Sequence, residues 1–134
     1  MTKLEEAIQF LKNLESQRIK NKQSRAKSCL GDVRAALSHV GLRIPSPMEK
    51  PNNTALANGH AMIKMPEFYG WEQIHSPLTD EPVLLYFKGC GILKDGRTAG
   101  HIAIKRGNKL YANITYNWNQ WWADRVIGAF KIES

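Results

Sequence analysis

The segment "AKSCLGDVRAALSHVG" (residues 26–41) places a cysteine at the start of a short helix. Ser28 is a favoured N-cap residue, apolar side chains recur behind it at helical spacing, and a glycine follows the last of them. The unpaired N–H groups and the dipole at a helix N-terminus stabilise a thiolate. Cys29 is therefore either a small core residue or a thiol placed to react. The basic side chains of Arg25 and Lys27 favour the second interpretation if they lie nearby.

Around this helix, helical patterns come first in the chain and strand patterns come later. Residues 3–17 carry an apolar stripe opposite charged side chains, and residues 54–64 suit a further short helix. Short β-branched and aromatic segments separated by Gly, Asn and Asp indicate four antiparallel strands, at residues 82–89, 100–107, 109–116 and 125–133. This order predicts an α+β fold, with N-terminal helices packed on a small antiparallel sheet of about four to six strands.

Length and composition predict one domain spanning residues 1–134, in which residues 1–24 form a helix and a basic segment leading into the cysteine helix. No apolar run approaches the roughly 20 residues of a membrane helix. The N-terminus also lacks the apolar stretch and cleavage site of a secretory signal. We therefore expect a monomer without a transmembrane segment, synthesised in the cytoplasm without a signal peptide.

Charge and cysteine content narrow the choice of partners. The chain has 19 Lys and Arg against 12 Asp and Glu, a formal charge of +7, which attracts nucleic acid, anionic lipid or cell-wall polymers. A solvated basic surface with no dedicated partner is the plain alternative. Two cysteines are too few for a disulfide scaffold or a structural zinc site, so we take both as free thiols. Cys90 lies among glycines at a strand end, which favours a structural role.

A histidine and an asparagine complete a candidate constellation with Cys29. His101 opens the strand-like "HIAIKRG" after small residues, so its imidazole can form an ion pair with the thiolate and later protonate a leaving amine. Asn113 follows on the next strand of the hairpin turned by "RGNK", roughly opposite His101, where its amide oxygen can orient the ring. Asn117 is the weaker alternative for this third position, and His60 is the alternative base.

Together these features resemble those of the CHAP and NlpC-type papain-like peptidoglycan amidases. "CLGDVRAALSHVG" is similar to the nucleophile helix of that family, "AGHIAI" to its histidine strand, and "PVLLYF" to the strand before it. The sequence departs from the family at "TDEPV", where a Gly-Asp commonly opens that strand, and at Ser28, where many NlpC-type members have aspartate. The resemblance covers roughly residues 25–130 and implies a papain-like fold.

The resemblance implies a cysteine amidase or endopeptidase that hydrolyses an amide or peptide bond in the stem peptide or cross-link of bacterial peptidoglycan. Cys29 would be the nucleophile, His101 the base and then the acid, and Asn113 the orienting residue, with backbone N–H groups near Cys29 stabilising the oxyanion. The implied mechanism requires no metal or other cofactor.

The missing export signal fits two biological settings. One is a phage endolysin released through a holin, and the other is an antibacterial effector carried by a secretion apparatus, with an immunity protein as its partner. In both settings the enzyme would act on the cell wall or in the periplasm after release.

Aromatic side chains are candidates for substrate binding, because their rings offer apolar faces with one polar group at the edge. Trp71, Tyr116 and Trp118 are assigned to a groove for glycan or peptide. Core packing is the alternative for the tryptophans.

Two rival functions stay open. A basic module that binds single-stranded nucleic acid would use the same charge and aromatic residues without catalysis. The chain shows no recognised nucleic-acid motif, and its basic residues are dispersed outside residues 18–27, so we expect no specific nucleic-acid partner. An amidase fold that has lost catalysis and only binds the cell wall is the other rival.

Overall fold

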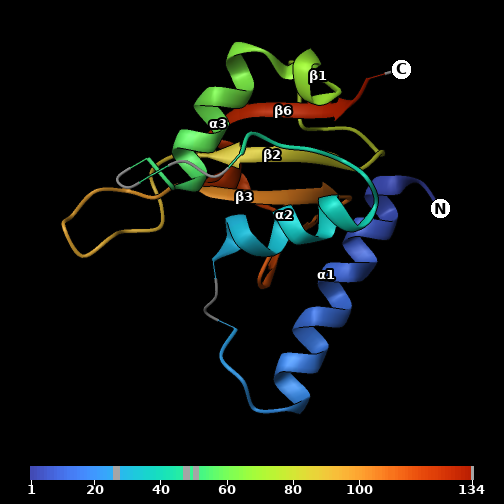
Figure 1. The fold of residues 1–134 in the computed structure, drawn as a ribbon, viewed down its shortest axis with the longest axis vertical. Coiled ribbons are helices and arrows are strands. Elements are labelled where there is room, and N and C mark those ends of the chain that lie inside the picture. Colours follow the sequence, from blue (N-terminus) through green and yellow to red (C-terminus); the bar gives the residue numbers. More distant parts are fainter. Residues whose placement is uncertain (26–27, 47–48, 50–51, 134) are drawn as a thin grey trace.

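In the part of the chain that the structure describes, three helices come first and six strands follow. Figure 1 shows the helices α1 and α2 beside the central strands of the sheet. This computed structural model describes residues 1–25, 28–46, 49 and 52–133. The helical elements are α1 (Lys3–Lys20), α2 (Cys29–His39), α3 (Ala55–Lys64), the short 3-10 helix η1 (Pro66–Tyr69) and α4 (Gln120–Ala123). The strands are β1 (Trp71–Ile74), β2 (Val83–Phe87), β3 (His101–Arg106), β4 (Lys109–Tyr111), β5 (Thr115–Asn117) and β6 (Val126–Ile132). All six pair antiparallel in the order β1-β6-β2-β3-β4-β5, which confirms the predicted α+β class.

Side-chain caps fix where the three long helices begin. Thr2 and Glu5 form a capping box at α1. The Ser28 hydroxyl accepts a hydrogen bond from the Gly31 N–H at α2, and the Thr54 hydroxyl accepts one from the Ala57 N–H at α3. The predicted helices therefore start at the residues that their local sequence favours.

The sheet departs from the strand pattern in two places. The single strand expected over residues 109–116 is divided into β4 and β5 by a bend at residues 112–114. A strand not expected from the sequence, β1, pairs with β6 at the far edge. With four residues, β1 is too short to produce a clear alternation, and its pairing partner lies at the other end of the chain.

Opposite faces of the central strands are covered by different parts of the chain. On one face the helices α2 and α3 pack on β2 and β3, and the Tyr86 hydroxyl donates to the Asn58 amide oxygen of α3 at 2.6 Å. Phe87 points to the opposite face, because neighbouring residues of a strand alternate. There it meets Trp122 from the connection between β5 and β6, with ring centroids 5.0 Å apart.

Because both faces are covered, β2 is apolar at every position. All five residues of β2 and the first five of β3 are buried, and the helices and sheet share one hydrophobic core. In the part of the chain that the structure describes, no helix has the length and apolar character needed to cross a membrane.

Candidate active site

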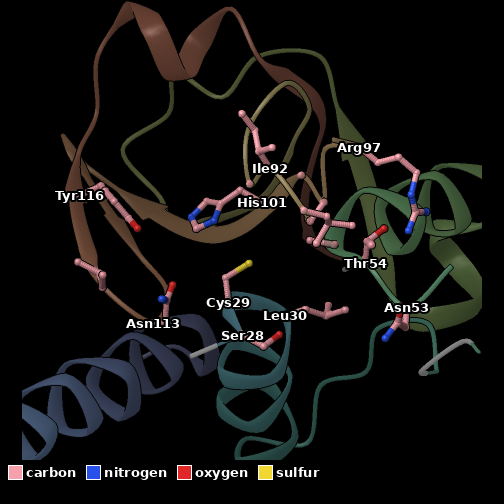
Figure 2. A pocket seen from close by; sticks show the side chains of 16 residues that line it. Ser28, Cys29, Leu30, Asn53, Thr54, Ile92, Arg97, His101, Asn113 and Tyr116 are labelled. Carbon is pink, nitrogen blue, oxygen red and sulfur yellow. The ribbon is translucent and has the colours of Figure 1, made fainter. Parts of the chain in front are cut away.

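An open cleft of about 870 Å³ lies where the N-terminus of α2 meets the start of β3 (Figure 2). Cys29, His101, Asn113 and Tyr116 all line it. The remaining walls come from the segment that leads into α3 and from the glycine-rich connection between β2 and β3. The structure thus brings together the three residues that the sequence suggested for catalysis.

Cys29 is the first residue of α2 and is half-buried at the cleft. The Ser28 cap orients the first turn of the helix, so the cysteine side chain is presented at the helix end (Figure 2). The backbone N–H of Ile102 donates toward the sulfur, which places the thiol directly beside the first residues of β3.

His101 is held in an aromatic cage and is only 8% exposed. The ring centroids of Trp122, Tyr116 and Phe87 lie 5.1, 5.5 and 5.9 Å from that of the imidazole. Gly100 makes this placement possible, since its φ is +73° and an added Cβ would lie 2.7 Å from the Phe87 carbonyl oxygen. The small residues before His101 thus allow close packing of the backbone.

Asn113 lies in the bend between β4 and β5 and not on a strand, which corrects the sequence-based placement. The register pairs Ile104 with Tyr111, and continuing it would set Ile114 opposite His101. Asn113 therefore reaches the same cleft as His101 through the bend at residues 112–114 and not through strand pairing. Asn113 is buried, and its Nδ2 donates to the Arg25 carbonyl oxygen at 3.0 Å.

Two buried polar atoms at the cleft have no hydrogen-bond partner within the described residues: Nε2 of His101 and Oδ1 of Asn113. An imidazole N–H is a donor and an amide oxygen is an acceptor, so the two are chemically complementary. Each unpaired buried group costs about 1–3 kcal/mol. Catalytic hydrogen bonds are often long in ligand-free proteins and shorten in the substrate complex.

The electrostatics differ from the ion pair expected from the sequence. Burial raises the pKa of the Cys29 thiol and outweighs the opposing effect of the backbone N–H groups of Ile102 and Leu30. Burial also lowers the pKa of His101 to about 4. Both shifts favour the uncharged thiol and imidazole in the free protein, in contrast to the ion pair expected from the sequence.

A partly buried ion pair lies one turn of helix away from the sulfur. Arg18 of α1 forms two hydrogen bonds to the carboxylate of Asp32, at 2.5 and 3.1 Å. The carboxylate of Asp32 contributes to the raised pKa of Cys29, and Arg18 compensates this negative charge. Sequence reasoning missed the pair, since nothing in the local pattern of α1 marks Arg18 as a contact of α2.

Two of the three aromatic residues assigned to substrate lie outside the cleft. Trp71 is fully buried in the core, and its Nε1 donates to the Arg43 carbonyl oxygen at 2.6 Å. The Trp118 ring packs beside the Lys105 ammonium, 5.1 Å away. These positions correct the assignment of both tryptophans, and Tyr116 alone of the three lines the cleft.

The alternative candidates for the orienting residue and for the base lie away from the cleft. Asn117 is exposed and accepts a hydrogen bond from the Lys109 ammonium at 2.5 Å, and His60 is exposed on α3; neither lines the cleft. Lys27 lies outside the described residues. Among the residues that are described, no group of three His, Cys, Asp or Glu side chains is placed to hold a metal ion.

Comparisons with known proteins bear on the fold. No model of a protein family matches the sequence, and no curated protein matches it. The chain is similar in structure to a chain of the type VI native effector–immunity complex Tae3–Tai3 from Ralstonia pickettii, with a TM-score of 0.59 over 99% of this chain and 100% of that one. At 12% identity this likeness concerns the fold alone.

Proposed function

We propose that the protein is a cysteine hydrolase that cleaves an amide or peptide bond in the peptide portion of bacterial peptidoglycan. The observation that supports this proposal most is the convergence of Cys29, His101 and Asn113, from three distant parts of the chain, on one open cleft. A buried cysteine that only filled space would need neither a cleft nor an imidazole beside it.

The neutral charge state of the pair sets the order of proton transfers. His101 accepts the thiol proton as the Cys29 sulfur attacks the substrate carbonyl carbon, and a tetrahedral oxyanion forms. The imidazolium then gives that proton to the leaving amine while the C–N bond breaks, which leaves a thioester on Cys29. Water attacks the thioester, His101 takes a proton from this water, and the carboxylic acid product leaves as the thiol is restored.

The start of α2 suits the stabilisation of the oxyanion. The first backbone N–H groups of a helix have no partner within the helix. Those of Cys29 and Leu30 both lie close enough to the sulfur to lower its pKa. A carbonyl carbon bonded to this sulfur would hold its oxygen close to the same donors.

The likeness to a chain of an effector–immunity complex favours one biological setting within this proposal. We place the protein among antibacterial effectors that reach the cell wall of a target bacterium after secretion, with an immunity protein as the cognate partner. A phage endolysin is the alternative setting, and a binding protein without activity is the alternative function.

Mass spectrometry of digested peptidoglycan tests the proposal. Purified sacculi incubated with the wild-type protein are expected to release fragments with one new amine and one new carboxylate, and the position of the new ends identifies the bond. Cys29→Ala protein is the blank. Intact sacculi after prolonged incubation, together with salt-sensitive binding to single-stranded DNA, would support the nucleic-acid-binding alternative instead.

A further inference from the structure

The N-terminal helix α1 contacts the segments behind the cleft through one acidic side chain, Glu15. Its Oε1 accepts a hydrogen bond from the Thr115 hydroxyl at 2.9 Å, and its Oε2 accepts one from the Thr115 backbone N–H at 3.1 Å. Oε2 also lies 3.3 Å from a guanidinium nitrogen of Arg25. A single carboxylate on α1 therefore holds two segments that lie far apart in the sequence.

These two segments are the ones that fix Asn113. Thr115, the first residue of β5, follows Asn113 by two residues, and the Arg25 carbonyl oxygen accepts the hydrogen bond from Asn113 Nδ2. Because Nδ2 is occupied on the Arg25 side, the amide is oriented with Oδ1 as its free acceptor at the cleft. The carboxylate of Glu15 thus contacts both segments that flank the Asn113 amide.

The contacts that Glu15 makes with Arg25 and with Thr115 differ in strength. The Arg25 side chain is 45% exposed, so its ion pair with Glu15 is screened by water and contributes little. The Glu15 side chain is only 14% exposed, and both hydrogen bonds from Thr115 go to its charged carboxylate. Such charge-assisted bonds are about twice as strong as neutral ones. Thr115 is therefore the main partner.

We propose that Glu15 is a positioning residue, which holds Thr115 at the start of β5 so that the Asn113 amide oxygen in the preceding bend faces His101. The effect on turnover rests on the hydrolase function proposed above. The effect on the chemistry of the Cys29 thiol does not, because alkylation by iodoacetamide needs no substrate.

A double-mutant cycle between Glu15 and Asn113 tests the proposal. Glu15→Gln keeps the side-chain shape and removes the charge, and Glu6→Gln makes the same change at an exposed site on the same helix. We expect Glu15→Gln to lower kcat about tenfold with little change in KM, and Glu6→Gln to leave both unchanged. Glu15→Gln combined with Asn113→Ala should be no slower than Asn113→Ala alone, because both changes act through the same amide.

The same variants are also compared by the rate at which iodoacetamide alkylates Cys29. Peptide mapping distinguishes alkylation of Cys29 from alkylation of Cys90. We expect parallel, non-additive decreases of a few-fold near pH 7, since a misaligned imidazole is a poorer proton acceptor. If the protein proves to have no hydrolase activity, the alkylation cycle still decides the role of Glu15.

A second pair of variants covers the case in which Glu15→Gln does not fold. Thr115→Ser keeps the hydroxyl that donates to Glu15, and Thr115→Val replaces it with a methyl group of similar size. We expect the serine variant to match the wild type and the valine variant to match Glu15→Gln. Equal behaviour of the two Thr115 variants, or effects of Glu15 and Asn113 that multiply, would overturn the proposal.

Discussion

Cys29 and Cys90 offer a comparison of two thiols in one small protein. Both are half-buried, and burial is the main reason that the pKa of each is raised. Their surroundings differ, because Cys29 begins a helix and lines the cleft with His101, whereas Cys90 lies in a connection where its carbonyl oxygen accepts a hydrogen bond from the Gly100 N–H at 2.9 Å. Acidity at rest therefore does not distinguish the proposed nucleophile from Cys90. The cleft that Cys29 shares with His101 does.

The largest expected effect is the loss of activity when the Cys29 sulfur is removed. Cys29→Ala should abolish the decrease in turbidity of purified sacculi, because no other group in the cleft can form the thioester. Cys90→Ser is the matched control and should keep most of the activity. Equal loss in both variants would show that the nucleophile has been misassigned.

Removal of the His101 imidazole tests whether a proton acceptor in the cleft makes Cys29 react differently from Cys90. His101→Ala is expected to lower kcat by about 10²–10⁴-fold, the usual contribution of a positioned acid–base group. It should also slow the alkylation of Cys29 by iodoacetamide and leave that of Cys90 unchanged. If both thiols slow equally, the variant has altered the fold and not the proton transfer.

Stability should depend on pH through the buried imidazole. The pKa of His101 is lowered from 6.5 to about 4, so the unfolded chain takes up this proton at a higher pH than the folded protein does. The free energy of unfolding should therefore fall by roughly 1 to 3 kcal/mol as the pH decreases from about 6.5 to about 4. His101→Gln should flatten this dependence in urea unfolding, with His60→Gln as the control for loss of an exposed histidine.

The smallest effect is expected for the orienting amide. Asn113→Ala should lower kcat about tenfold, because it leaves the groups that exchange bonds and protons in place. Asn117 is the alternative candidate for the orienting residue. Asn117→Ala should leave kcat unchanged, since the Asn117 side chain is exposed and accepts a hydrogen bond from Lys109. Steady-state kinetics on a defined peptide fragment would separate the two, and a larger loss for Asn117 would reverse the assignment.

Local patterns were sufficient to predict most of the fold. The cap at Ser28, the apolar stripe of α1 and the runs that form β2, β3 and β6 are all properties of neighbouring residues. The strand β1 and the division between β4 and β5 were missed, because both depend on pairing and on contacts with distant segments.

The candidate site was predicted in part. The choice of Cys29, His101 and Asn113 followed from residue type, spacing and a family resemblance, and the structure brings all three to the cleft. The neutral state of the pair was not predictable, because it results from burial that only the folded chain creates. The aromatic cage of His101 was missed for a similar reason, since Trp122 reaches the imidazole only by way of the connection that crosses the sheet.

The connection between β5 and β6, which carries Trp122 across the sheet, has a consequence for the order in which the residues of the candidate site are synthesised. Of these three residues, Cys29 leaves the ribosome first, His101 follows 72 positions later, and Trp122 comes 21 positions after His101. A nascent chain that stops short of Trp122 carries the thiol without the ring that encloses the imidazole. The ring that encloses the imidazole is thus the last of these groups to be synthesised.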